Sequence, residues 1–588
     1  MKKYFLAFLA LLVIPFCLQL VLVDNSSFKW AHFRWYLIIS VLFGYVLSKF
    51  EYKKSFLTNF TLMYATMGIS VAATYKFIKK TQLNGEFLWD ELTTSIAILG
   101  VLYSVFFAFQ YRKINISKIF SVIEILLLVP YLANIGYAVV EHDCITANSL
   151  IAIYQTNPVE IWEFMKATAP LYTYGFGIFF LIILFLLLYK TLKNTEILNK
   201  SISKKEIIFL VIIFISAVFI GNKTFKDSYF SRIALESNGY LKSVKAYNEY
   251  RLDASGKSKY IEARTTSADN ETYLVVIGES QNRKHMSAYG YSRDTTPWLK
   301  AQLNNKNFVV MENGYACNTL TMLALSQALT EKSQYNHRNL ETSYSLVDIA
   351  KAAGFKTYWI SNQAQFGSFN TPITLIADSA DERIWLNSDS SAGSSYDEKI
   401  LPILKNIRGN ERKIIFIHLY GNHWEYKHRY PKGSFDKYDG QKVAEKVVDL
   451  QKLNEYDNSI YYNDTVAKEI FNYAVNNWNL CSMVYFSDHG EAVKSNNKHI
   501  PSKYEDDMGT VPVYWYFSDE YRRKHLDLVK FAQLRKEVYF TNDMMYNALL
   551  NVWRINTPYY DAKEDFLSEK YGYKKEDLLI LDEIKISK

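Results

Sequence analysis

The sequence predicts a protein of two parts: an N-terminal bundle of membrane-spanning helices and a C-terminal α/β domain with a mainly parallel sheet. In this chain of 588 residues, nearly all long uncharged runs lie before residue 222. After residue 265, short runs of strand type alternate with helical stretches, which is typical of α/β folds. We therefore expect a transmembrane domain over 1–222, a helical linker over 223–265 and a water-soluble domain over 266–588.

Seven apolar runs are long enough, or nearly so, to cross a bilayer core of about 30 Å, which takes roughly 20 residues. The last run is short for a full span, so the count is left open between five and seven. The first run lacks a small-x-small cleavage site and is followed by further spans. An uncleaved helix is therefore favoured over a cleaved signal peptide. The runs lie near 4–23, 33–49, 56–78, 92–111, 118–140, 171–190 and 206–222.

Basic residues are concentrated in alternate loops between these runs. Cytoplasmic loops of membrane proteins carry an excess of lysine and arginine. This pattern places the N-terminus in the cytoplasm and everything after residue 222 on the outer side, which requires an odd number of spans. The basic residues are Lys2, Lys3, Lys49, Lys53, Lys54, Arg112, Lys113, Lys118, Lys190, Lys193, Lys200, Lys204 and Lys205.

Two features of the membrane part carry further expectations. Glu124 lies inside the fifth run, and it either serves a function or reaches the membrane interface, because charged groups inside membranes are costly. The loop 141–170 is expected to be an insert on the outer face. Its segment 149–164 has apolar residues at nearly helical spacing, which predicts a helix on the membrane surface, with a plain connector as the alternative.

Charge and cysteine content exclude several classes of protein. The formal net charge is only +8, and no dense basic run accompanies a nucleic-acid-binding motif, so we expect no nucleic-acid partner. There are four cysteines and no CxxC or Cys/His finger spacing, which argues against a disulfide-built fold. A bridge between Cys317 and Cys481 stays possible in an oxidising compartment.

Polar side chains come directly after four of the predicted strands. In an open α/β sheet the ligand site lies beyond the carboxyl ends of the strands, so we expect these side chains to surround one crevice. Carboxylate and imidazole groups together suit zinc or a similar divalent ion. Taken singly, each pair is more typical of a surface loop. The strands and their polar residues are 273–277 with Glu279, 356–360 with Asn362, 414–417 with His418 and His423, and 483–486 with Asp488 and His489.

The motifs, taken together, resemble the bacterial phosphoethanolamine transferases of the alkaline phosphatase/sulfatase superfamily. Val275-Val-Ile-Gly-Glu-Ser280 resembles the opening of their catalytic domain, and further matches follow in family order. The resemblance therefore implies an alkaline-phosphatase-like fold for residues 266–588. The further matches are at 289–297, 318–321, 328–330, 358–363, 418–423, 456–460 and 487–491, and in the membrane part at 155–160.

The resemblance also implies a site. In that family a Glu, a Thr, an Asp and a His hold a zinc ion, and the matching positions are Glu279, Thr321, Asp488 and His489. The threonine is also the nucleophile. Two further histidines approach the phosphate or a second metal, and they match His423 and His499. One zinc ion is expected, with a second zinc or Mn²⁺ as alternatives; His418 would lie behind these ligands. Thr156 and Glu160 match a region used near the lipid donor.

The implied reaction moves phosphoethanolamine from phosphatidylethanolamine to a glycolipid acceptor, lipid A or the lipopolysaccharide core, through a phospho-threonine intermediate. The implied location is the bacterial inner membrane, with the catalytic domain in the periplasm and the chain a monomer. Three departures favour a branch other than the lipid A branch: the soluble part has only Cys317 and Cys481, seven spans are predicted where the well-known members have five, and no lysine follows Asn362-Gln363 closely.

Four rival interpretations are weaker. A sulfatase would need a Cys/Ser-x-Pro-x-Arg motif, and Cys317-Asn-Thr-Leu-Thr321 lacks the proline and the arginine. A phosphoglycerol transferase or phosphodiesterase of the same superfamily would share the threonine and the metal. A non-catalytic scaffold would have lost its ligands, and a transporter would carry more ionisable residues in its spans. Thr321 could also be no more than the N-cap of a helix that begins at Met322.

Overall fold

The computed structural model describes residues 30–49, 54–77, 86–112, 114–155, 161–162, 165–166, 171–193, 204–250, 260–364, 371–387 and 395–586. The chain divides into two compact units. Unit 1 comprises Met1–Ile153 and Met165–Gly239, and unit 2 comprises Tyr154–Phe164 and Tyr240–Lys588.

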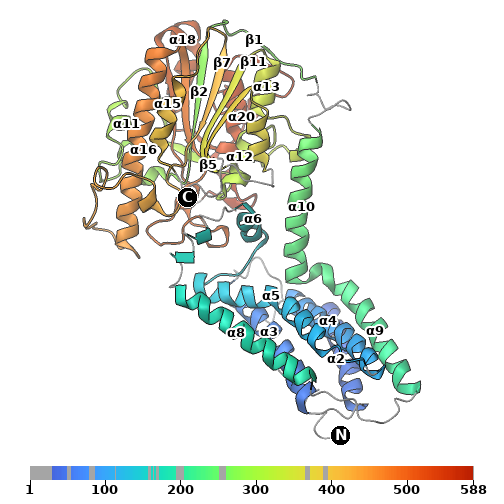
Figure 1. Cartoon of the computed structure of the whole chain (residues 1–588). Helices are drawn as coiled ribbons and strands as arrows, with labels where there is room; N and C mark the ends of the chain where they lie inside the picture. Colours follow the sequence, from blue (N-terminus) through green and yellow to red (C-terminus); the bar gives the residue numbers. More distant parts are fainter. Residues whose placement is uncertain are drawn as a thin grey trace. The chain divides into compact units, whose positions relative to one another are not determined.

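Unit 1 is a bundle of helices (Figure 1). Each of the last six predicted apolar runs coincides with a helix, and the first run, 4–23, lies outside the described residues. Among the described residues, the segments Trp89–Phe109, Ser117–Glu141 and Thr173–Lys193 are long and apolar enough to cross a membrane. The helices are α2 (Trp30–Lys49), α3 (Lys54–Phe77), α4 (Glu86–Tyr111), α5 (Ser117–Glu141), α6 (Ala147–Gln155), α8 (Leu171–Lys193) and α9 (Lys204–Thr224).

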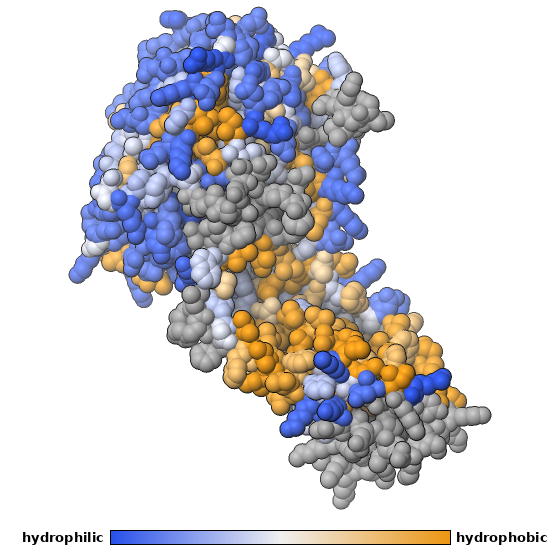
Figure 2. All heavy atoms as spheres, viewed as in Figure 1, coloured by the Kyte–Doolittle hydropathy of each residue, from blue (hydrophilic) through white to orange (hydrophobic). Residues whose placement is uncertain are grey.

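On the face of unit 1 that Figure 2 shows, most of the coloured surface is apolar. Along α8, Ile178, Phe179 and Phe180 are each more than half exposed. Large apolar side chains that face outward on a helix of this length are expected where the surroundings are lipid.

Glu124 is inside unit 1 and does not reach its surface. Its side chain is fully buried, and Asn59 and Tyr103 donate hydrogen bonds of 3.2 Å each to its two carboxylate oxygens. The suggestion that this carboxyl extends to the membrane interface is therefore wrong. Hydrogen bonds between helices satisfy polar groups that lipid cannot.

The outer-face segment and the linker are helical in part: residues 142–146 and 260–263 form no helix, and Arg264–Thr265 form the short strand β1, so the expectation of a helical linker over 223–265 holds only up to Tyr250 among the described residues. Helix α6 covers the first part of the loop 141–170, while 156–160, 163–164 and 167–170, including Thr156 and Glu160, lie outside the described residues. Helix α10 (Tyr229–Tyr250) follows α9 through a short 3₁₀ turn. Its Val244 and Tyr247 belong to the apolar core of unit 2.

Unit 2 is built on a seven-stranded sheet in the order β3-β9-β8-β2-β7-β5-β6. The four strands predicted from the sequence are the adjacent parallel strands β8, β2, β7 and β5. Within this sheet β9 alone runs opposite to the other six strands. This confirms the predicted α/β class with a mainly parallel sheet. The strands are β2 (Thr272–Gly278), β3 (Phe308–Met311), β5 (Lys356–Ala364), β6 (Glu382–Asn387), β7 (Lys413–His418), β8 (Leu480–Ser487) and β9 (Val513–Phe517).

Helices cover both faces of this sheet (Figure 1). Every residue of β2, β7 and β8 is buried, as expected for strands enclosed on both sides. One face packs against α12 (Thr321–Ala328), α13 (Leu346–Ala352), α14 (Pro372–Asp378) and α20 (Met545–Val552). The other packs against α15 (Ile400–Leu404) and the long α16 (Leu450–Asn477). Smaller helices are α11 (Pro297–Ala301), α17 (Asp506–Gly509), α18 (Asp519–Lys524) and α19 (Leu526–Leu534).

Short strand pairs complete unit 2. They are β1 (Arg264–Thr265) with β11 (Ile555–Asn556), β4 (Asn313–Tyr315) with β10 (Tyr539–Thr541), and β12 (Leu579–Ile580) with β13 (Ile584–Lys585). Cys317 and Cys481 are both free and buried, so the bridge considered between them is not formed.

Candidate metal centre

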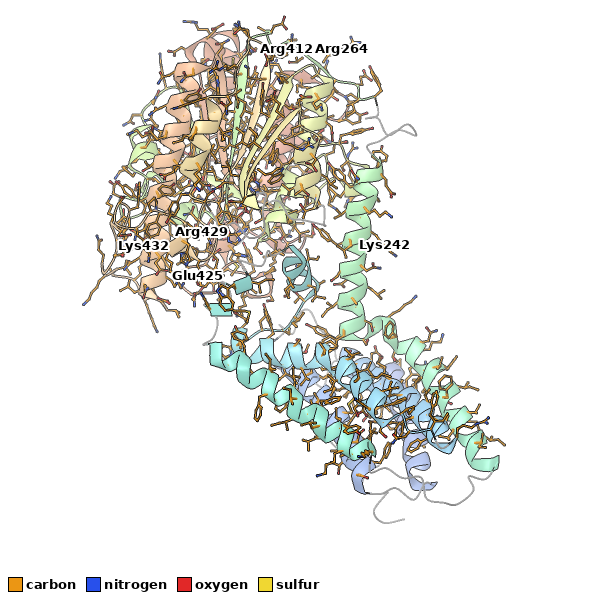
Figure 3. The ribbon with its side chains drawn as sticks, viewed as in Figure 1. Lys242, Arg264, Arg412, Glu425, Arg429 and Lys432 are labelled. Atoms are coloured by element: carbon orange, nitrogen blue, oxygen red, sulfur yellow. The ribbon has the colours of Figure 1, made fainter. Side chains whose placement is uncertain are left out.

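The predicted site residues of the central strands meet at one edge of the sheet. Glu279 directly follows β2, and Asp488 and His489 directly follow β8, the neighbouring strand. Figure 3 shows which edge this is: Arg412, just before β7, lies at the opposite end of unit 2 from Glu425 and Arg429, which come after that strand. Side chains at the carboxyl ends of adjacent parallel strands necessarily share one crevice.

Thr321 joins this group from the first residue of α12. Its Oγ1 lies 3.1 Å from Glu279 Oε2 and 3.4 Å from His489 Nε2. His489 Nε2 is in turn 3.4 Å from Asp488 Oδ2 and 3.5 Å from Glu279 Oε1. The structure therefore brings Glu279, Thr321, Asp488 and His489 into one cluster.

The cap interpretation of Thr321 is wrong. Helix α12 begins at Thr321, its N-cap is Leu320, and no side chain caps it. The Thr321 hydroxyl instead faces the carboxylate of Glu279 and the imidazole of His489. Its place in the first turn of α12 is favourable for an incoming phosphate, because the free N–H groups and the helix dipole attract anions there.

The backbone on either side of the cluster fixes its carboxylates. The N–H groups of Ser280 and His489 both donate to Asp488 Oδ1, at 2.9 and 2.7 Å. The Ser280 hydroxyl donates to Glu279 Oε1 at 2.8 Å, from a backbone with a left-handed φ of 55°. Gln363, near the end of β5, donates through Nε2 to Glu279 Oε2 and to the carbonyl of Leu419.

This donor set fits a zinc ion. Glu279, Asp488 and His489 each offer a ligand atom within 4.8 Å of the others, and all three are buried. Asp488 Oδ2 is buried and has no hydrogen-bond partner, which is unfavourable unless a cation binds there. His489 Nδ1 lies 2.9 Å from the Gly490 carbonyl, so the Nδ1–H tautomer leaves Nε2 free to coordinate, as in most histidine–metal sites. Carboxylate and imidazole are zinc ligands.

Burial and mutual repulsion shift the pKa values of these groups. Burial, followed by the neighbouring Asp488, raises the pKa of Glu279 well above its ordinary value. Burial opposes ionisation of Asp488 too, but His489 and the hydrogen bonds to its oxygens lower its pKa. Burial lowers the pKa of His489, which keeps its imidazole neutral and able to act as a ligand. The two buried carboxylates repel each other at this distance, and a divalent ion bound by both would offset the repulsion.

His499 lies beside this cluster, in a second group with Glu491. The rings of His489 and His499 are 4.7 Å apart, and His499 Nδ1 lies 2.8 Å from Glu491 Oε2. Burial alone would lower the pKa of His499, but the Glu491 carboxylate raises it above its ordinary value. His489, Glu491 and His499 also offer ligand atoms within 4.8 Å of one another.

The other two histidines lie at and after the end of β7. His418 is buried with neither ring nitrogen hydrogen-bonded, and burial lowers its pKa to about 4, so it is neutral at physiological pH. His423 lies five residues further on, with its ring stacked on Tyr420 at 5.2 Å and its Nδ1 2.7 Å from the Trp424 carbonyl. The loop that carries it is anchored to β2, because Asn422 N–H donates to the Glu279 carbonyl at 3.0 Å.

The residues of α16 that hold these loops had no role in the sequence-based prediction. Tyr456 donates to the Ser280 carbonyl at 2.7 Å and accepts from Asn282 N–H at 2.9 Å. The Ser459 hydroxyl accepts from the Asn422 side chain at 2.6 Å. The motif match at 456–460 was the only indication in the sequence that these residues matter. It did not show which loops they contact, because those loops lie far away in the chain.

Residues 271–550 match the family model described as Sulfatase. The chain is 32% identical over 333 residues to the phosphoethanolamine transferase EptC of Escherichia coli (strain K12), a match that covers 52% of this chain and 57% of that protein. It is 30% identical to the phosphoethanolamine transferase CptA of Salmonella typhimurium, with 51% and 56% covered. The chain thus spans little more than half the length of the curated relatives it matches.

Two solved structures are similar to this one. A crystal structure of the C-terminal periplasmic domain of EptC from Escherichia coli, in complex with Zn, is 28% identical with a TM-score of 0.50, covering 54% of this chain and 91% of that one. The integral membrane protein lipooligosaccharide phosphoethanolamine transferase A (EptA) from Neisseria meningitidis is 17% identical with a TM-score of 0.58, covering 85% and 98%. The second likeness extends the shared fold into the helical membrane part and confirms the predicted two-part fold class.

Proposed function

Because residues 271–550 form a sulfatase-family domain, and the curated relatives above are phosphoethanolamine transferases, we propose that this chain is one too. It transfers the headgroup of phosphatidylethanolamine to a cell-surface glycolipid, lipid A or the lipopolysaccharide core. The observation that carries the proposal is the convergence of the Thr321 hydroxyl on Glu279, Asp488 and His489, around a buried carboxylate oxygen that has no hydrogen-bond partner.

The first step is attack of Thr321 Oγ1 on the phosphorus of the donor lipid. A bond forms between the threonine oxygen and phosphorus, the bond from phosphorus to the glycerol oxygen breaks, and diacylglycerol leaves with a proton. The chain then carries phosphoethanolamine on Thr321. The position of Thr321 in the first turn of α12 supports this step, because the turn's free N–H groups favour the phosphate charge.

The second step reverses the first with a different oxygen. A hydroxyl of the acceptor attacks the phosphorus, its bond to Thr321 Oγ1 breaks, and the threonine regains a proton. His499 is suited to donate and accept this proton, since its Nδ1 is held by Glu491 and its ring lies beside that of His489. His423, on the loop anchored to the Glu279 carbonyl, is the second candidate.

Glu279, Thr321, Asp488 and His489 are proposed to hold one zinc ion, and the group His489, Glu491 and His499 offers room for a second ion or for Mn²⁺. Bound zinc would lower the pKa of the threonine hydroxyl and offset the charge of the phosphate. The chain's own groups keep the Thr321 hydroxyl in place. Gln363 and Ser280 orient the Glu279 carboxylate, which accepts a hydrogen bond from this hydroxyl.

A membrane part has a clear use in this reaction. The donor is a bilayer lipid. A domain anchored to the bilayer stays close to its donor, which raises the effective concentration of the donor at the site. We propose a bacterial inner-membrane protein, monomeric, with its N-terminus in the cytoplasm and residues 266–588 in the periplasm. The basic loops after 49, 112 and 190 support this orientation.

Diacylglycerol release from phosphatidylethanolamine by the purified full-length protein tests the proposal. We expect release from the zinc-loaded wild type, loss of at least about a thousandfold in Thr321→Ala, and partial activity in Thr321→Ser, which keeps a hydroxyl. Chelator should abolish release, and added zinc should restore it. Equal rates for wild type and Thr321→Ala would contradict the proposal.

The same assay separates the rival donors. Phosphatidylglycerol in place of phosphatidylethanolamine should release no diacylglycerol, whereas a phosphoglycerol transferase would prefer it. Release without any capture by lipid A or core oligosaccharide would indicate a phosphodiesterase instead.

A further inference from the structure

The segment that leads to Thr321 lies beside a second segment, which leads to Asn542. Strands β4 and β10 are parallel, and Tyr315, the last residue of β4, is opposite Thr541, the last residue of β10. Both strands run in the same direction, so the residues that follow them leave the pair side by side. Asn542 directly follows β10, and Cys317 follows β4 by two residues and precedes Thr321 by four.

The side chain of Asn542 joins this segment to the loop of the proposed zinc ligands. It is fully buried. Its Oδ1 accepts a hydrogen bond from Cys317 N–H at 2.9 Å, and its Nδ2 donates to the Asp488 carbonyl at 2.7 Å and to the Ser487 carbonyl at 3.3 Å. These partners fix which end of the amide faces which segment, because an N–H group needs an acceptor and a carbonyl needs a donor. A single side chain therefore connects the segment of the proposed nucleophile with the backbone of a proposed metal ligand.

Cys317 is held from its other side as well. Its carbonyl accepts a hydrogen bond from Leu581 N–H at 2.8 Å. Leu581 lies in the turn that joins β12 to β13, with a left-handed φ of 56°. Between Cys317 and Thr321, the chain is closed into a short turn by Asn318, whose Oδ1 accepts from Leu320 N–H at 3.1 Å. The stretch that ends in Thr321 is therefore short and fixed at its start, so a shift of Cys317 would be transmitted to the threonine.

The cluster depends on this connection because its members come from separate parts of the chain. Thr321 Oγ1 lies 3.4 Å from His489 Nε2, although the two residues are 168 positions apart in the sequence. Asn542 bonds to the backbone of the residue just before His489 and to the segment that carries the threonine. Loss of its amide would deprive a buried N–H and a buried carbonyl of this partner, and both segments would shift to find another.

We propose that Asn542 is a positioning residue for the transfer reaction. Its side-chain amide sets the distance between the Thr321 hydroxyl and the ligand groups of Asp488 and His489. Because it is fully buried, it touches no substrate. The inference rests on the proposed function and deepens it, since it assigns the spacing of nucleophile and metal ligands to a residue that is neither. The alternative is an amide that stabilises the fold and has no separate effect on the reaction.

The kinetics of diacylglycerol release by Asn542→Leu, measured with saturating zinc, separate these two roles. Leucine has a similar size and no polar atom in its side chain, so the two segments lose their connection. We expect kcat to fall about 100-fold, as for a misplacement of about 1 Å, while KM for phosphatidylethanolamine stays within about twofold of wild type, since no substrate contact is removed. Asn542→Asp keeps the acceptor for Cys317 N–H but has no N–H for the Asp488 carbonyl, and its kcat should fall in the same way. It carries the test if Asn542→Leu does not fold.

Asn547→Leu is the matched control. Asn547 lies on α20, is 4% exposed, and accepts from Asp561 N–H at 2.8 Å, outside the cluster. We expect its melting temperature to fall, as that of Asn542→Leu does, while its kcat stays at the wild-type value. Equal losses of kcat in the two variants at equal losses of melting temperature would overturn the inference. A wild-type kcat in a folded Asn542 variant would overturn it too.

Hydrogen exchange of the full-length protein adds a measurement that needs neither zinc nor turnover. In Asn542→Leu, peptides that contain residues 316–321 and 487–489 should exchange faster than in wild type, because their shared anchor is lost, and in Asn547→Leu they should not. Unchanged exchange at both places would overturn the inference. Absence of diacylglycerol release by wild type would instead refute the proposed function, so the two failures are distinguishable.

Discussion

Tyr456 offers a sharp test of how the fold supports the metal centre. Its hydroxyl is fully buried and joins two groups of the loop after Glu279: it donates to the Ser280 carbonyl at 2.7 Å and accepts from Asn282 N–H at 2.9 Å. Tyr456→Phe removes both hydrogen bonds and leaves a buried N–H without a partner. Such losses cost about 1–3 kcal/mol of stability.

The consequence for the metal should exceed the consequence for stability. Ser280 is in a left-handed conformation, and it contacts both Glu279 and Asp488, so its release would disturb two ligands together. Loss of groups that orient metal ligands typically weakens metal binding by about 10–100-fold. Competition with a fluorescent chelator measures the zinc affinity of the full-length protein, and thermal unfolding measures its stability.

Tyr521→Phe is the matched control. Tyr521 is equally buried, and its hydroxyl donates to the Val552 carbonyl at 2.7 Å, away from the cluster. We expect it to lose stability while its zinc affinity stays at the wild-type value. If the two variants lose similar stability and neither changes in zinc affinity, Tyr456 has no positioning role and the reasoning is refuted.

Four other substitutions or treatments test contacts in the same unit. Gly421→Ala should reduce both stability and transfer, because Gly421 has a φ of 52° and a Cβ there would lie 2.9 Å from Glu279 N; wild-type values of both would contradict this. Asp457→Asn should lower the unfolding free energy by about 3–5 kcal/mol, since buried Asp457 pairs with Arg293 at 2.7 Å, and an unchanged denaturation curve would refute it. Glu279→Gln should lose zinc binding in the chelator competition, and retained affinity would remove Glu279 from the ligand set. A reducing agent should leave the melting temperature unchanged, because Cys317 and Cys481 are free; a fall would reveal a disulfide.

The strand positions were sufficient to predict that Glu279, Asp488 and His489 meet, because side chains at the carboxyl ends of parallel strands share one edge of the sheet. Asn362, predicted for the same crevice, donates to Asp397 and to the Ser395 carbonyl instead. Glu279, Asp488 and His489 each closely follow a recognisable apolar run, and those runs are neighbours in the sheet. The place of Thr321 came from the family resemblance. Strands β3 and β9, at one side of the sheet, were not predicted, since β9 contains the mixed aromatic run Val513–Phe517 and reverses direction.

The residues that support the site could not be predicted from the sequence. Asp397 accepts from the N–H groups of Tyr420 and Gly421, yet it lies more than twenty residues away, in a stretch without a motif. Tyr456 and Asn542 are similar cases, because a hydrogen bond across the fold leaves no spacing pattern. The cap interpretation of Thr321 failed for a related reason: a threonine at a helix start looks the same whether its hydroxyl faces its own backbone or a carboxylate.

The most direct test of the central claim is the mass of the protein during turnover. Full-length, zinc-loaded protein incubated with phosphatidylethanolamine and no acceptor should gain the mass of one phosphoethanolamine group. Fragmentation should place this group on Thr321, and acceptor should remove it. Diacylglycerol release by a wild-type protein that carries no adduct, or an adduct that persists in Thr321→Ala, would contradict the assignment of Thr321 as the nucleophile.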